Sequence, residues 1–174
     1  MCNHTIYEQT VKVQKKYDTR NPFQLLQAMK ADVRESYQYS RLKGYCYYAN
    51  RSTFVVINGL LDDAEKTIVA AHEAAHLILH HHQIMSAPMR DLFLYDMTSK
   101  LEYEANLFAA DFLIEDERVL SLIDDEEMDF FSLCKTLYLT PEFLSFKLYS
   151  LIQRGFRCTM PLTLDSRFLK KGDV

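Results

Sequence analysis

The chain has 174 residues, with 20 Lys and Arg against 24 Asp and Glu, a formal charge of −4 and a sequence pI near 5.9. Its length fits one domain, since compact domains cluster at roughly 100–150 residues, and its 48% of hydrophobic residues exclude a disordered chain. The acidic balance argues against nucleic-acid binding as the main function, because the phosphate backbone selects for basic surfaces. Composition therefore predicts one ordered, slightly acidic domain that spans residues 1–174.

The sequence carries no recognisable targeting or membrane signal. Its first residues, MCNHTIYEQT, lack the basic start and apolar stretch of a secretory signal. The longest apolar tract, residues 67–79, is interrupted by charged and histidine residues and is shorter than the roughly 18–20 residues that span a bilayer. The four cysteines lie far apart, which is typical of reduced thiols. We therefore expect a cytoplasmic protein that has no membrane partner.

Helical and strand-like patterns both occur in the first half of the chain. Asn21-Pro22 is typical of a helix start, and runs of aromatic and β-branched residues are typical of strands. Asp62 or Asp63 can cap the helix that follows the strands. The patterns predict a helix at 22–36, an antiparallel hairpin with strands at 44–49 and 53–58, and a second helix at 64–81.

The second half of the chain is predicted to be mostly helical. The Ser86-Ala87-Pro88 break indicates an irregular stretch that ends at Thr98. Because the strands precede most of the helices, the fold class is predicted to be α+β, with a small antiparallel sheet packed against the buried 64–81 helix. Apolar spacing then predicts helices at 99–114, 128–137 and 140–154. A short strand is predicted near the end, at 157–162.

Five of the six histidines are crowded between positions 72 and 82. The H-E-x-x-H motif at 72–76 places His72 and His76 on one helix face, where both imidazoles can reach one ion. A catalytic Zn²⁺ site is completed by a carboxylate and a water. Glu73 is one helical step away, where it can act as general base and accept a proton from that water. The alternative is two core histidines bonded to neighbours, with Glu73 at the surface.

A carboxylate on the 99–114 helix can supply the third ligand, and Glu102 and Glu104 are the candidates. At about 100° per residue, Glu102 shares its face with small residues and Asn106, as expected where two helices pack closely. Glu104 shares its face with Asp111, which predicts a side closer to solvent. We therefore expect Glu102 as the ligand, Glu104 as the reserve, and Asn106 as a residue that can orient a ligand by hydrogen bonding.

Three further histidines follow the motif. His82 has the spacing of the third ligand in H-E-x-x-H-x-x-G-x-x-H sites, but Leu79 stands where those sites need a glycine. We therefore expect His80, His81 and His82 to form an exposed helix end, where positive charge suits the helix dipole. His80 lies one turn beyond the motif and is also a candidate for contact with substrate.

The segments AAHEAAHLILHH and LEYEANLFAADFLI together resemble the ImmA/IrrE family of metallo-endopeptidases. The resemblance implies Zn²⁺ bound by His72, His76 and Glu102, with Glu73 as general base, the same residues that the spacing favours. It extends over about 44–114, with a looser match beyond. The expected zincin-like domain then comprises a catalytic core at 44–114, a helical C-terminal segment at 115–155 and a tail at 156–174.

The resemblance also implies a substrate. Members of the family are commonly encoded on mobile elements beside a helix-turn-helix repressor that they cleave, so we expect a zinc endopeptidase that relieves repression. A zinc-stabilised antirepressor that only sequesters its partner would use the same ligands, and the sequence leaves it open. A third alternative is a DNA-binding regulator, because 131–154 faintly resembles a helix-turn-helix, but acidic residues make that segment a poor match for DNA. No oligomeric state is predicted.

Overall fold

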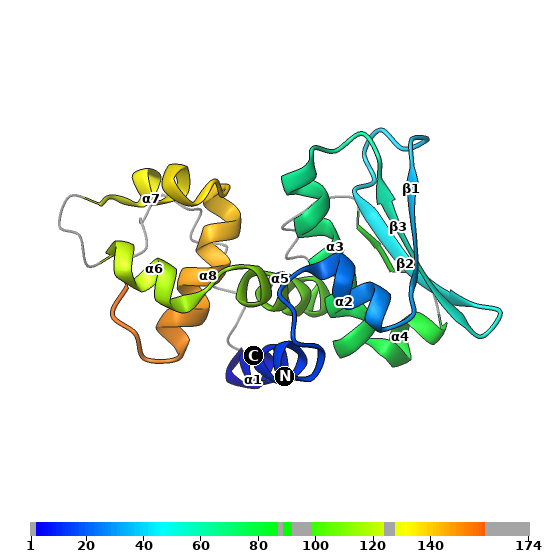
Figure 1. Ribbon diagram of the computed structural model, residues 1–174, viewed down its shortest axis with the longest axis horizontal. Helices are drawn as coiled ribbons and strands as arrows, with labels where there is room; N and C mark the ends of the chain where they lie inside the picture. Colours follow the sequence, from blue (N-terminus) through cyan, green and yellow to red (C-terminus); the bar gives the residue numbers. More distant parts are fainter. Residues whose placement is uncertain (1–2, 87–88, 92–98, 124–127, 159–174) are drawn as a thin grey trace.

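A sheet with its helices forms one side of the molecule, and a group of helices forms the other (Figure 1). The structure, a computed structural model, describes residues 3–86, 89–91, 99–123 and 128–158. The predicted α+β class is confirmed. In chain order the elements are α1 Asn3–Tyr17, α2 Pro22–Ala28, β1 Asp32–Ser36, β2 Gly44–Ala49, β3 Ser52–Asn58, α3 Asp63–Leu79, α4 His81–Ser86, β4 Met89–Asp91, α5 Lys100–Leu113, α6 Asp116–Ile123, α7 Phe130–Leu137 and α8 Pro141–Gln153.

The strands form one mixed sheet in the order β1-β3-β2-β4. The predicted hairpin is confirmed: β2 and β3 pair antiparallel with Cys46 opposite Val55. Asn50 and Arg51 at its turn have φ angles of 51° and 60°, and two successive positive values are typical of the tight turns that suit strand twist. The expectation of a wholly antiparallel sheet is wrong, because β1 runs parallel to β3 with Val33 opposite Val55.

The predicted helix over 22–36 is wrong in its second half. Asn21 caps α2 as expected, and its side chain accepts hydrogen bonds from the backbone of the first turn. The helix ends at Ala28, and Lys30 has a φ of 59°, a left-handed conformation that cannot continue a right-handed helix. The chain then extends into β1, so Val33 belongs to a strand rather than to a helical stripe.

Several elements lie where no separate helix or strand is predicted, among them α4 and α6. α1 occupies the first part of the chain, and β4 pairs antiparallel with β2 within the stretch that was expected to be irregular. The strand expected around 157–162 lies mostly outside the described residues. Among the described helices, none is both long and apolar enough to cross a bilayer.

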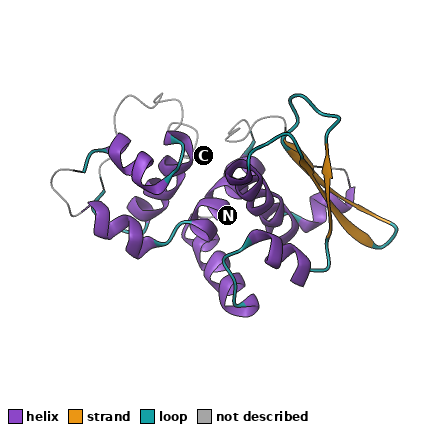
Figure 2. Cartoon of the chain, turned by 45° about the horizontal axis from the view of Figure 1, so that its top comes forward, coloured by secondary structure: helices purple, strands orange, loops and turns teal. Residues whose placement is uncertain are grey.

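The helices α3 and α5 pack against each other in the centre of the molecule, and Figure 2 shows α3 beside the sheet. α3 contacts β2 and β3, while α5 also contacts α1 and α8. Both helices are rich in buried alanines, and small side chains let neighbouring elements pack closely. The fully buried alanines of these two helices are Ala70, Ala71, Ala74, Ala75, Ala105, Ala109 and Ala110.

A buried ion cluster holds α8 against α5. Lys147 Nζ of α8 donates to Asp111 Oδ1 at 2.9 Å and to Asp116 Oδ1 at 2.5 Å, and Arg154 forms a two-pronged pair with Asp116. The expectation that the Asp111 side of α5 is closer to solvent is therefore wrong, because α8 covers it and supplies the opposite charge. These ion pairs thus fix α8 to α5.

Candidate metal centre

The centre of α3 carries the predicted motif into the interior of the protein. Asp62 caps the helix by accepting a hydrogen bond from the Glu65 amide at 2.7 Å, as the sequence predicts. His72 is 2% exposed, and Glu73 and His76 are 0% exposed. The Nε2 atoms of His72 and His76 lie 2.9 Å apart. The spacing of four residues therefore brings both imidazoles to one point.

Glu102 comes to the same point from α5. Ser99 caps this helix by accepting a hydrogen bond from the Glu102 amide at 3.2 Å, so Glu102 stands in the first turn, where the helix dipole favours a carboxylate. Its Oε2 is 3.1 Å from His72 Nε2 and its Oε1 is 3.6 Å from His76 Nε2. Burial raises the pKa of Glu102, but hydrogen bonds and charges from the two imidazoles outweigh it and hold the pKa well below its usual range.

The three side chains fit a tetrahedral metal ion. His72, His76 and Glu102 each offer one donor atom, and these atoms lie within 4.8 Å of one another. Zinc bonds of about 2.0–2.1 Å in a tetrahedron separate neighbouring donor atoms by about 3.3 Å. The separations of 2.9, 3.1 and 3.6 Å between the donor atoms lie on both sides of that value. Within the described parts of the chain, no other group of three or more His, Cys, Asp or Glu side chains brings its donor atoms this close together.

Asn106 of α5 fixes the ring of His72. Its Oδ1 lies 3.0 Å from His72 Nδ1. Because an amide oxygen can only accept, His72 Nδ1–H is the donor, so Nε2, on the side of the cluster, is the nitrogen that a metal ion would use. Asn106 is fully buried. The sequence correctly predicts it as a residue that hydrogen-bonds one of the candidate ligands.

Glu73 points to strand β2 rather than to the surface, which excludes the alternative of an exposed Glu73. A Cβ atom built on Gly44 would lie 2.8 Å from Glu73 Oε1 and 2.5 Å from Val69 Cγ1. Gly44 is therefore needed where the carboxylate approaches the strand. No motif in the sequence marks Gly44 as part of the site, although a glycine within a strand often marks such a close approach.

The expected exposure is right for His81 and His82 and wrong for His80, and the expected helix end is wrong for His81 and His82, which begin the separate helix α4. His80 is 1% exposed because α3 ends at this residue and its ring turns inward. Its Nδ1 lies 3.0 Å from His76 Nδ1, and its Nε2 lies 3.0 Å from Glu104 Oε2. Burial lowers the pKa of His80, although the hydrogen bond with Glu104 opposes the shift. Glu104, also expected near solvent, is 4% exposed and faces His80 rather than the donor cluster.

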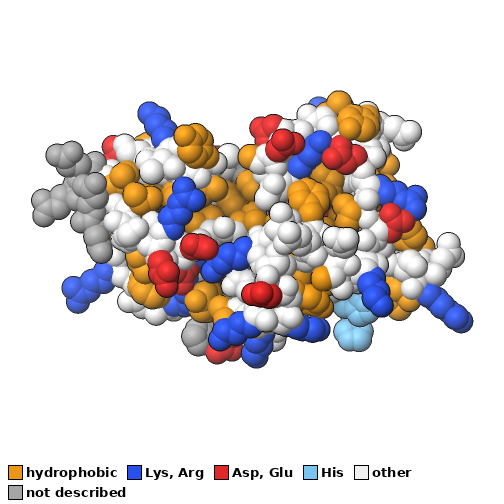
Figure 3. All heavy atoms as spheres, in the orientation of Figure 1, with side chains coloured by type: hydrophobic (Ala, Val, Ile, Leu, Met, Phe, Trp, Pro, Cys, Tyr) orange, Lys and Arg blue, Asp and Glu red, His pale blue; other side chains and the backbone are white. Residues whose placement is uncertain are grey.

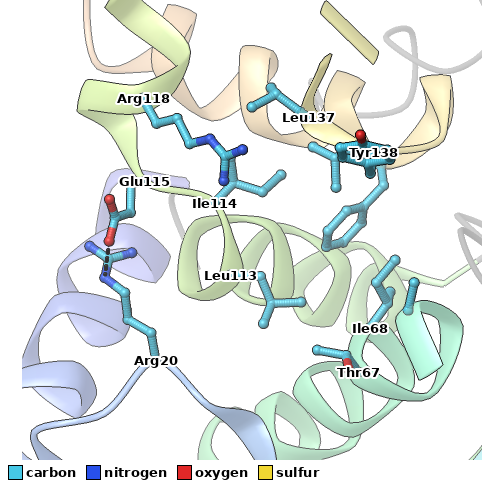
Figure 4. Close-up of a pocket in the computed structure, with 12 residues that line it drawn as sticks. Arg20, Thr67, Ile68, Leu113, Ile114, Glu115, Arg118, Leu137 and Tyr138 are labelled. Atoms are coloured by element: carbon cyan, nitrogen blue, oxygen red, sulfur yellow. Dashed lines mark ion pairs between the residues drawn. The ribbon is translucent and has the colours of Figure 1, made fainter. Parts of the chain in front are cut away.

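A separate cavity of about 480 Å³ lies where α3, α5 and the α7–α8 turn meet. Figure 4 shows apolar side chains, among them Ile68 and Leu113, along its walls, and the Arg20–Glu115 ion pair, 3.4 Å long, at one side. Tyr138, 89% exposed, stands at the α7–α8 turn. The described lining includes no histidine, so this cavity is distinct from the donor cluster. On the face seen in Figure 3, basic and acidic side chains are interspersed.

A buried H-E-x-x-H helix, a glutamate from the next long helix and an adjoining mixed sheet are features of a metallopeptidase-type α+β domain. The comparisons with known proteins agree: the chain belongs to the Peptidase_M78 family, described as the IrrE N-terminal-like domain, whose model matches residues 27–149. This is a metallopeptidase family, and the resemblance stated from the sequence is confirmed.

A curated relative comes from a bacterial virus. The chain is 36% identical over 102 residues to "Uncharacterized immunity region protein 2" of Bacillus phage phi105. The match covers 59% of this chain and 63% of the relative, so the chain spans less than two thirds of that protein's length. No solved structure matches the chain.

Proposed function

We propose that this protein is a zinc-dependent endopeptidase that hydrolyses a peptide bond in a helix-turn-helix transcriptional repressor and thereby relieves repression. The observation that carries the proposal is the convergence of His72, His76 and Glu102 within 4.8 Å, next in sequence to the buried Glu73. Membership of a metallopeptidase family supports the reaction class. The phage relative's name, which places it in an immunity region, supports a repressor-related role. A repressor substrate also implies that the reaction takes place in the cytoplasm.

In this proposal His72, His76 and Glu102 hold the ion, and Glu73 transfers protons. A zinc ion bound there supplies Lewis-acid activation of a water molecule and of the scissile carbonyl. Glu73 accepts the proton of the attacking water and delivers it to the leaving amine. Glu102 supplies the anionic ligand from the first turn of α5, where the helix dipole favours a carboxylate. Asn106 holds His72 in the tautomer that this role requires.

We further propose that residues 1–174 act as one domain, with the core 44–114 supported by the helical segment 115–155. The observation that supports this organisation is the position of α5, which contacts α3 on one side and α8 on the other. The buried pair between Lys147 and Asp111 joins the two parts.

The proposal is tested by incubating the purified protein with the repressor encoded beside it, with and without a chelator, while zinc content is measured by mass spectrometry. The wild type should contain about one zinc per chain and release a defined repressor fragment that the chelator prevents. Glu73→Gln should keep its zinc and lose cleavage, because the base is removed while the donor atoms remain. Glu117→Gln changes an exposed carboxylate on α6 in the same way and should alter neither quantity.

Two results would overturn the proposal. One is a wild type that holds no zinc after purification without chelator, and the other is undiminished cleavage by Glu73→Gln. Relief of repression that persists in Glu73→Gln without any repressor fragment would indicate a protein that sequesters its partner instead of cutting it.

A further inference from the structure

We propose that His80 and Glu104 are positioning residues for the metal centre, linked in a hydrogen-bond chain that fixes the ring of His76 and directs its Nε2 atom to the ion. The proposal rests on the metal-dependent function proposed above and adds two residues that do not belong to the donor cluster. It begins from two contacts, His80 Nε2 to Glu104 Oε2 and His80 Nδ1 to His76 Nδ1, each 3.0 Å long.

The acceptor at one end of the chain sets the direction of each hydrogen bond. The ionised carboxylate of Glu104 can only accept, so His80 Nε2 carries the hydrogen. In the neutral ring of His80, Nδ1 then has the lone pair and accepts from His76 Nδ1–H. Nε2, the atom 2.9 Å from His72 Nε2, is consequently the nitrogen of His76 that is left to bind an ion. A metal ligand requires this tautomer of His76.

The chain lies inside the protein, where water competes little for its hydrogen bonds. His76, His80 and Glu104 are 0%, 1% and 4% exposed. His72, His76 and His80 follow one another at intervals of one helical turn, and their ring centroids are separated by 4.7 and 5.1 Å. The helix α3 therefore presents a row of three imidazoles rather than a pair.

The helix α5 supplies a partner to each end of this row. Asn106 accepts from His72, Glu104 accepts from His80, and Glu102 lies between them at the donor cluster. The two candidate ligands nevertheless differ: His72 donates to a neutral amide, whereas the chain from His76 ends on a carboxylate. A carboxylate linked to a ligand's second ring nitrogen raises the basicity of the ligand. We therefore expect the affinity for zinc to depend on the chain through His76.

Variants at His80 can separate the hydrogen bond from the volume of the side chain. His80→Leu fills the space but removes the acceptor for His76, while His80→Asn keeps an oxygen close to the position of Nδ1. His81→Leu is a matched control, because His81 is the same residue type one position further along and is exposed. Glu104→Gln keeps an acceptor for His80 and removes the charge.

The measurements are the dissociation constant of Zn²⁺, by competition with a chromogenic chelator, and the visible absorption spectrum of the Co²⁺-loaded protein. His80→Leu should weaken zinc binding about 10–100-fold and shift the cobalt bands, because the ring of His76 is no longer fixed. His80→Asn should restore most of the affinity, and Glu104→Gln should lie between the wild type and His80→Leu. Far-UV circular dichroism of the metal-free proteins shows whether each variant folds.

The outcomes distinguish this proposal from the function on which it rests. Wild-type affinity and an unchanged cobalt spectrum in both His80→Leu and Glu104→Gln would overturn the positioning role while the metal centre stands. If His80→Leu does not fold, Glu104→Gln decides the question, since it preserves shape and changes charge. A wild type that binds neither Zn²⁺ nor Co²⁺, or a His72→Ala variant with undiminished affinity, would overturn the metal centre itself.

Discussion

Gly44→Ala tests whether the first residue of β2 must lack a side chain for Glu73 to keep its position. The added methyl group would lie 2.5 Å from Val69 Cγ1 and 2.8 Å from Glu73 Oε1, whereas ordinary contacts begin at 3.4 Å. The two groups must therefore move away by about 0.9 and 0.6 Å, because the Val56 carbonyl at 3.3 Å restricts any movement of the added methyl in the other direction. Overpacking of this kind costs about 1–3 kcal/mol of the free energy of unfolding.

The same displacement should affect catalysis more than it affects metal binding. A misplacement of about 1 Å at a reacting group can reduce a rate by about 100-fold, so a shift of about half that size in Glu73 should reduce turnover by about 10–100-fold. Zinc content should be unchanged, because the donor atoms of the cluster are on other residues. The assay combines initial rates of repressor cleavage, zinc analysis and urea unfolding of the same preparations.

Two further variants make this prediction specific. Gly59→Ala is the matched control: its added methyl meets the ring of Tyr37 at 2.5 Å, but Tyr37 is 63% exposed and can turn into solvent. Adding Val69→Ala to Gly44→Ala relieves the clash with Val69 and leaves the clash with Glu73. The free energy of unfolding should therefore recover while the cleavage rate stays low. A Gly44→Ala protein that cleaves at the wild-type rate, or one that loses zinc in proportion to its rate, would refute the reasoning.

Three other predictions concern the surroundings of the site. Asn106→Ala removes the acceptor of His72 Nδ1–H and should weaken zinc binding by about 10–100-fold; equal affinity in chelator competition would contradict this. Lys147→Met removes the nearer of two cations that pair with the buried Asp111, with Arg154 left at 3.8 Å, and should lower the free energy of unfolding in urea by about 3 kcal/mol. Burial raises the pKa of Asp116, but ion pairs with two cations outweigh it and hold the pKa well below its usual range. Its stabilising contribution is therefore fully present above about pH 4 and is lost as the pH falls further, and Asp116→Asn should flatten that dependence in acid unfolding.

The parts of the fold that the sequence predicts correctly are those set by short-range interactions. Asn21 and Asp62 begin helices as the sequence predicts, because their side chains accept hydrogen bonds from amides of the first turn. Such caps can be recognised within a few residues of sequence. The spacing of His72 and His76 is equally local, since one helical turn brings residues four apart together.

The parts that the sequence does not predict depend on partners distant in the chain. The helical pattern through Val33 is consistent with α2 continuing, and only pairing with β3 decides in favour of a strand. From the sequence alone, Asp111 is expected to face solvent. In the structure it is buried against Lys147, which lies 36 residues later in the chain. His80 likewise receives its partner Glu104 from 24 residues away. Periodicity assigns residues to a common face, but it does not determine what covers that face.

The helix α5 joins these long-range contacts to the candidate site. Near its start, Tyr103 packs on Tyr149 of α8 with ring centroids 6.2 Å apart, and near its end Asp111 pairs with Lys147 of the same helix. α8 therefore holds α5 at both ends, and Glu102 is adjacent to the first of these contacts. Capping by Ser99 fixes where the helix begins, but the distance of Glu102 from the imidazoles of α3 also depends on how α5 is packed. The C-terminal helices thus contribute to the geometry of the donor cluster through the helix that they support.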